Sequence, residues 1–141
     1  MLKNYGADYT LLDDGNLSSG LKEIFPKGVS KVLELVGPKT LPDSMKCLTQ
    51  FGICCNTGVL GGVEYMDEFD PIKTIPNNCY LTSFFSNYPT QEIMDELFNF
   101  IVEKEIKPKI SKVFTDLNDI SNAHKLMESN KAQGKIVFKL K

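Results

Sequence analysis

The sequence contains no cysteine pair spaced for metal binding, no long apolar run and no excess of positive charge. Its four cysteines include no CxxC pair, and its one histidine has no structural-zinc spacing to them, so no metal site is predicted. No stretch approaches the roughly 20 apolar residues that a membrane span needs, and the first ten residues have no apolar signal core. A net charge of −2 lacks the clustered positive charge that nucleic acid requires. These absences predict a cytoplasmic protein with no metal, no membrane and no nucleic-acid partner.

The composition is that of an ordinary folded protein. With 141 residues, of which 42% are hydrophobic and 24% charged, the chain is long enough for one domain with a sizeable core. Cys54, Cys55 and Cys79 stand inside apolar runs, where a cysteine behaves as a small hydrophobic residue. We interpret them as reduced structural thiols, and a redox-sensitive cysteine is the alternative.

Short runs rich in β-branched or aromatic residues alternate with amphipathic stretches along the chain. This alternation is typical of βαβ units, so the predicted fold class is α/β, a mainly parallel sheet flanked by helices. The runs predict strands at 8–12, 31–36, 52–57, 79–85, 109–114 and 135–140, and helices at 17–25, 41–49, 90–105 and 117–127. Expected N-caps of the first, second and fourth helices are Asn16, Thr40 and Asp116. We expect the irregular stretch between 58 and 78 to cover part of the structure.

A set of short motifs follows in order along nearly the whole chain. They are Gly6-Ala7-Asp8, Glu34-Leu35-Val36-Gly37, the run from Gly52 to Gly58, and a tail with Phe114, Leu117, Ala123-His124, Glu128 and Gly134-Lys135-Ile136-Val137. Each motif is weak alone, but in this order they resemble the medium-chain dehydrogenase/reductase superfamily. The resemblance is to its quinone-oxidoreductase-like kind, among the zinc-binding dehydrogenases.

The resemblance implies a division of the chain and a cofactor. Residues 1–107 would form part of a Rossmann-like nucleotide-binding domain. Residues 108–141 would form a C-terminal strand-helix-strand that in the family returns to the catalytic domain. The family uses NADPH or NADH, so the implied partners are a nicotinamide cofactor and a small-molecule substrate such as a quinone, an enone or a carbonyl compound.

In an open parallel sheet, ligands bind outside the carboxyl ends of the strands. In the family, the backbone at three of these ends lines the nicotinamide and its ribose. The resemblance therefore implies cofactor contacts at Val36, Gly37, Thr57, Gly58, Val59, Ser83, Phe84 and Phe85. The alternative is that Gly37 and Gly58 only permit tight turns. No catalytic residue is predicted, because His124, the one histidine, matches a family position that serves structure.

Two parts of the family pattern do not occur in this sequence. One is the phosphate-binding G-x-G-x-x-G turn with its strand and helix, and the other is the family's N-terminal domain. The first hypothesis is the C-terminal part of an NAD(P)H-dependent oxidoreductase, which alone we expect to be inactive. The alternative is a non-catalytic folded fragment, or a dimerising interaction module, with little cofactor affinity.

The missing strands have topological consequences. In the strand order 3-2-1-4-5-6, strand 8–12 loses its family neighbours, and we expect it to pair with 31–36 through a right-handed crossover. A strand lent by a dimer partner is the alternative. Strands 109–114 and 135–140 are expected to pair with each other or with the remaining sheet. Strand 79–85 is a possible homodimer edge.

Overall fold

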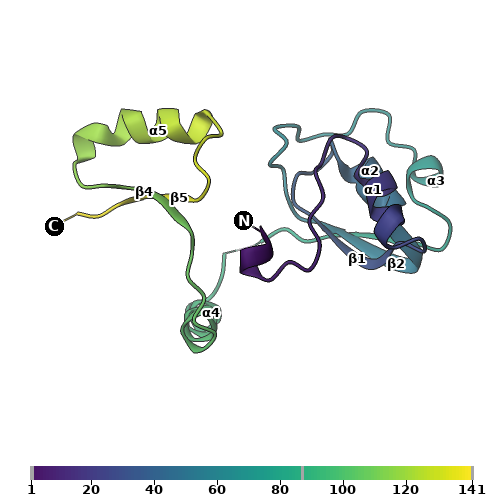
Figure 1. Ribbon diagram of the computed structural model, residues 1–141, viewed down its shortest axis with the longest axis horizontal. Helices are drawn as coiled ribbons and strands as arrows, with labels where there is room; N and C mark the ends of the chain where they lie inside the picture. The colour runs from purple at the N-terminus through teal and green to yellow at the C-terminus, as the bar shows by residue number, and fades with distance from the viewer. Residues whose placement is uncertain (1, 87, 141) are drawn as a thin grey trace. The chain divides into compact units, whose positions relative to one another are not determined.

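A computed structural model describes residues 2–86 and 88–140, and it divides into two compact units (Figure 1). The units are Met1–Asn87 and Tyr88–Lys141, and each is described by itself. The predicted domain boundary after residue 107 concerns the domains of the family and stays a prediction.

The first unit contains a three-stranded parallel sheet. Its strands are β1 (Val29–Glu34), β2 (Leu48–Asn56) and β3 (Tyr80–Ser83), in the order β1-β2-β3. Helices α1 (Leu17–Ile24) and α2 (Leu41–Lys46) lie side by side on one face of β1 and β2 (Figure 1). The predicted α/β class, a parallel sheet flanked by helices, is confirmed.

The core of this unit lies between α2 and the sheet. Leu41 and Met45 of α2 and Cys54 of β2 are buried, and Met45 and Cys54 are fully inaccessible to solvent. The loop between β2 and β3 adds Met66 and Ile75 to this core and contains the short helix α3 (Pro71–Thr74). The loop therefore covers part of the core, as the sequence predicts.

The predicted strand at Asp8–Leu12 is wrong, and so is its pairing with β1. The structure has a 3-10 helix, η1 (Leu2–Tyr5), followed by irregular chain up to α1. A strand needs a hydrogen-bonded neighbour as well as local propensity. Here β1 pairs with β2 alone among the described strands, and Leu12 is 86% exposed. Little apolar burial is left to hold this segment against the sheet.

The ends of the elements differ from prediction where tertiary hydrogen bonds take over. Helix α2 stops at Lys46, three residues early, because the Cys47 carbonyl accepts from the Val29 amide at 2.9 Å and leads into β2. Strand β1 stops at Glu34 because the carbonyls of Leu35 and Val36 accept from the loop after β2.

The second unit consists of a helix followed by a strand-helix-strand. Its elements are α4 (Gln91–Glu103), β4 (Ile110–Phe114), η2 (Leu117–Asp119), α5 (Ile120–Glu128) and β5 (Lys135–Phe138). Strands β4 and β5 pair with each other in parallel, which confirms the first of the two predicted pairings. The rings of Phe114 and Phe138 stack with centroids 5.3 Å apart. Asp116 caps η2 by accepting from the Asn118 amide at 2.9 Å.

Candidate functional site

The carboxyl ends of β1 and β2 are held together by the turns that follow them. The Thr57 amide donates to the Glu34 carbonyl at 2.9 Å, and the Gly61 amide donates to the Val36 carbonyl at 2.8 Å. The turn at Val36–Gly37 therefore lies directly against the segment after β2.

The end of β3 joins the same assembly. The Phe84 amide donates to the Asn56 carbonyl at 3.1 Å, and the Thr57 hydroxyl donates to the Phe84 carbonyl at 2.7 Å. The structure thus brings all three predicted segments, 36–37, 57–59 and 83–85, to adjacent strand ends. That they contact a cofactor stays a prediction.

Two glycines are required where these turns meet. A Cβ atom built on Gly58 would lie 1.8 Å from the Leu35 carbonyl oxygen, and one on Gly37 would lie 2.5 Å from the Gly58 carbonyl oxygen. Gly37 also has a φ of +97°, a conformation that other residues rarely adopt. The close approach of the two turns is thus sufficient reason for both glycines, and this agrees with the alternative explanation from the sequence.

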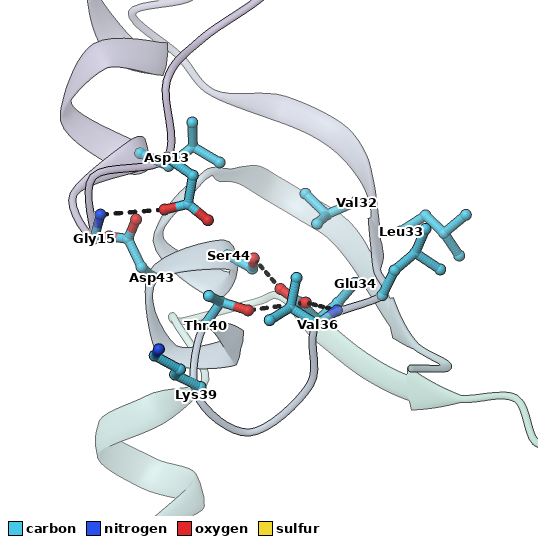
Figure 2. Close-up of a pocket in the computed structure, with 12 residues that line it drawn as sticks. Asp13, Gly15, Val32, Leu33, Glu34, Val36, Lys39, Thr40, Asp43 and Ser44 are labelled. Atoms are coloured by element: carbon cyan, nitrogen blue, oxygen red, sulfur yellow. Dashed lines mark hydrogen bonds between the residues drawn. The ribbon is translucent and has the colours of Figure 1, made fainter. Parts of the chain in front are cut away.

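The buried carboxylate of Glu34 accepts hydrogen bonds from the first turn, the one at Val36–Gly37. Oε1 of Glu34, a residue only 4% exposed, accepts from the Val36 amide at 2.7 Å, the Gly37 amide at 3.0 Å and the Thr40 hydroxyl at 2.9 Å. Its Oε2 accepts from the Ser44 hydroxyl (Figure 2). Burial alone would raise the pKa of Glu34, but the hydrogen bonds from Ser44, Gly37, Val36 and Thr40 hold it below its ordinary value. Glu34 is therefore an ionised and fully paired buried side chain.

A pocket of about 260 Å³ lies beside this carboxylate (Figure 2). It is lined by Asp13, Gly15, Leu17, Val32, Leu33, Glu34, Leu35, Val36, Lys39, Thr40, Asp43 and Ser44. Of the eight predicted cofactor-binding residues, Val36 alone lines it. The pocket therefore adjoins the first turn, and the other two turns do not line it.

A second carboxylate, that of Asp43 on α2, links α2 to α1 by hydrogen bonds. Asp43 accepts from the Ser18 amide at 3.0 Å and from the Ser18 hydroxyl at 2.5 Å, at the start of α1. Burial by itself would raise the pKa of Asp43. The hydrogen bonds from Ser18 outweigh this effect, so the pKa lies below its ordinary value. Asp43 therefore supplies the cap of α1 that was predicted for Asn16.

Two side chains that the sequence predicts as N-caps make other hydrogen bonds in the structure. These hydrogen bonds are what sequence reasoning missed. Neither Asn16 nor Thr40 accepts a backbone hydrogen bond through its side chain. Asn16 accepts from the Ser19 hydroxyl at 2.8 Å, and Thr40 donates to Glu34. The one available signal was Glu34 itself, a charged residue at the end of an apolar strand.

The predicted site also has exposed apolar side chains and one unpaired acceptor. Val59, Phe84 and Phe85 are 59%, 62% and 86% exposed. Oδ1 of Asn56, at the end of β2, is buried and has no hydrogen-bond partner among the described residues. The three exposed side chains therefore offer apolar surface at the strand ends.

The part of the chain that the structure describes contains no group of three or more His, Cys, Asp or Glu side chains that could hold a metal ion. All four cysteines are free thiols. Burial raises the pKa of Cys54 to about 11, so this thiol stays protonated and unreactive at neutral pH. His124 lies on α5, in a pocket of the second unit with Met127 and Phe138. The described residues therefore offer no set of side-chain ligands that would fit a zinc ion.

The fold and the strand ends define a class, an α/β protein with an open parallel sheet of the nucleotide-binding kind. The model of the family described as zinc-binding dehydrogenase matches residues 5–138. The chain belongs to this family, and the resemblance predicted from the motifs is confirmed. A comparison with curated protein sequences gave no significant match.

Solved structures show the same fold. An NAD-dependent alcohol dehydrogenase is 18% identical with a TM-score of 0.79, and the match covers 99% of this chain and 40% of that one. A mycobacterial protein solved with NADPH is 23% identical with a TM-score of 0.69, covering 96% and 45%. The quinone oxidoreductase from Coxiella burnetii is 22% identical with a TM-score of 0.69, covering 99% and 41%. The chain therefore spans less than half the length of these structures.

Among the described residues, no helix combines the length and the apolar character that crossing a membrane would require.

Proposed function

We propose that this chain is the C-terminal part of an NAD(P)H-dependent oxidoreductase that reduces a quinone, an enone or a carbonyl compound. In this proposal the eight residues at the strand ends receive the nicotinamide half of the cofactor. The bound cofactor supplies the hydride, and the protein positions its ring. The chain itself would be cytoplasmic.

The observation that carries the proposal is the assembly of the three turns. Turns 36–37, 57–59 and 83–85 meet at the carboxyl ends of adjacent parallel strands, where ligands of such sheets bind. The exposed side chains of Val59, Phe84 and Phe85 offer apolar surface to a flat ring. The family of the chain and a relative solved with NADPH support the same cofactor.

A second candidate is a non-catalytic folded fragment or dimerising module with little cofactor affinity. Parallel sheets are normally covered on both faces. On the face opposite α2, however, Leu33 is 64% exposed and Ile53 is 41% exposed. β3 forms one edge of the sheet, and it is the edge through which we would expect a homodimer. An incomplete covering of the sheet favours this second candidate for the chain alone.

Titration of the 141-residue chain with NADPH and with NADH, followed by nicotinamide fluorescence or calorimetry, separates the two candidates. Saturable binding at or below roughly 0.1 mM, worth about 5.5 kcal/mol, is the expected result of the first. No binding at millimolar cofactor is the expected result of the second.

A matched pair of aromatic variants then tests the site. Phe85 and Tyr65 are 86% and 79% exposed, so replacing either with alanine should change stability little. Only Phe85 lies in the predicted site. Phe85→Ala should weaken cofactor binding while Tyr65→Ala leaves it unchanged, and equal effects would overturn the assignment of the site.

A further inference from the structure

Glu34 reaches two parts of the molecule with its two carboxylate oxygens. Oε1 accepts from both backbone amides of the turn after β1, Val36 at 2.7 Å and Gly37 at 3.0 Å. The same oxygen accepts from Thr40, and Oε2 accepts from Ser44. A single side chain therefore connects the turn to the start and the middle of α2.

The turn that Glu34 holds is a fixed part of the strand-end assembly. The Val36 carbonyl accepts from Gly61 and the Leu35 carbonyl accepts from Leu60 at 3.3 Å, so the turn bonds to the loop after β2 through its carbonyls and to Glu34 through its amides. A Cβ on Gly37 or Gly58 would collide with the facing backbone, so the two turns lie in direct backbone contact.

Burying a carboxylate costs desolvation free energy, so stability alone is a weak reason to hold a turn with one. Desolvation opposes the charged form, and the four hydrogen bonds that Glu34 accepts have to offset this cost. The charge also sets the orientation of the donor groups, because an ionised acceptor holds several donors in one geometry. Accepting from two consecutive backbone amides sets where both peptide planes of the turn point.

We propose that Glu34 is a positioning residue that sets the orientation of the Val36–Gly37 backbone for the nicotinamide cofactor. The inference rests on the proposed function. Glu34 does not touch the cofactor; it acts through the turn, and its effect on binding exceeds its effect on folding.

Asp43 provides a matched control. It is also a carboxylate with a lowered pKa that accepts two hydrogen bonds, but it lies on α2 itself and its partner is Ser18 of α1, not the turn. Glu34→Gln and Asp43→Asn each remove one charge and keep the size of the side chain. Ser44→Ala removes only the bond to Oε2 and serves as the milder variant if Glu34→Gln does not fold.

The experiment measures three quantities on each variant: the unfolding midpoint, the dissociation constant of NADPH, and hydrogen exchange at the Val36 and Gly37 amides. Both carboxylate variants should lower the midpoint. Only Glu34→Gln should accelerate exchange at the two amides and weaken NADPH binding about tenfold, which is ~1.4 kcal/mol. Ser44→Ala should change both in the same direction by less.

The outcomes separate the inference from the proposed function. If the unaltered chain binds no NADPH, the proposed function fails for the chain, and exchange at Val36 and Gly37 still decides whether Glu34 orders the turn. Equal loss of NADPH affinity in Glu34→Gln and Asp43→Asn, in proportion to their stability, would reduce Glu34 to a structural residue. Unchanged exchange at the two amides would overturn the inference as well.

Discussion

Both units consist of parallel strands and helices, but they differ in how much apolar surface each one buries. In the first unit, Leu41, Met45 and Cys54 are buried between α2, the sheet and the loop after β2. In the second, Ala123 is the one buried apolar residue of the described part, and Phe98 of α4 is 58% exposed. A two-stranded sheet offers less surface for a core than a three-stranded sheet does. Regular secondary structure is thus no measure of a unit's own stability.

The largest difference is expected for the same substitution made in each unit. Met45 is fully buried in the first, whereas Met127 is 57% exposed in the second. Met45→Ala should lower the free energy of unfolding by about 2–5 kcal/mol, because it removes core contacts and leaves a cavity. Met127→Ala should cost less than ~1 kcal/mol. Urea unfolding of both variants checks this, and similar losses would mean that the second unit has a core of its own.

A glycine pair sharpens the comparison within the first unit. Gly58→Ala places a Cβ against the Leu35 carbonyl and should destabilise by roughly 1–3 kcal/mol or more, because backbone must move. Gly20, in α1, has only an ordinary contact at 3.7 Å, so Gly20→Ala should stabilise by about 0.5–1 kcal/mol. Thermal unfolding gives both signs. Tolerance of Gly58→Ala would show that the turns are less closely packed than described.

The smallest expected effect is on the acid side of the stability curve. The pKa of Glu34 is lower in the folded state than its ordinary 4.5, so its contribution is complete above about pH 4.5 and is lost as pH falls through the folded value. Asp43 behaves likewise from its ordinary 3.8. Glu34→Gln removes one of these two contributions. The fall in unfolding midpoint between pH 7 and pH 3 should therefore be shallower in Glu34→Gln, and parallel curves would contradict the assignment.

The sequence predicted the strands that find partners and failed for the one that does not. Apolar and β-branched residues mark the runs around β1, β2, β3, β4 and β5. The alternation of such runs with amphipathic stretches predicted a mainly parallel sheet. Asp8–Leu12 has similar local character, but no described strand lies beside it. Propensity is a property of a segment, whereas pairing is a property of its neighbours.

The sequence predicted the three strand ends of the candidate site but not the hydrogen bonds that hold them in place, and cofactor binding there stays a prediction. The turns at Val36–Gly37 and Gly58 carry a sequence signal, the glycines themselves, because close approach of two backbones excludes a Cβ. The hydrogen bonds of Glu34 to Thr40 and Ser44 carry none, since they depend on where α2 packs. The same packing redirects the capping of α1 from Asn16 to Asp43.

The sequence by itself determined the fold class, the family and the three strand ends, because these follow from local pattern, hydrophobic period and glycine placement. Tertiary structure alone decided that Glu34 is buried with its charge satisfied, that Asp43 joins α1 to α2, and that residues 8–12 form no strand. Each of these results from groups far apart in the chain meeting in space, where desolvation and the available hydrogen-bond partners determine the outcome.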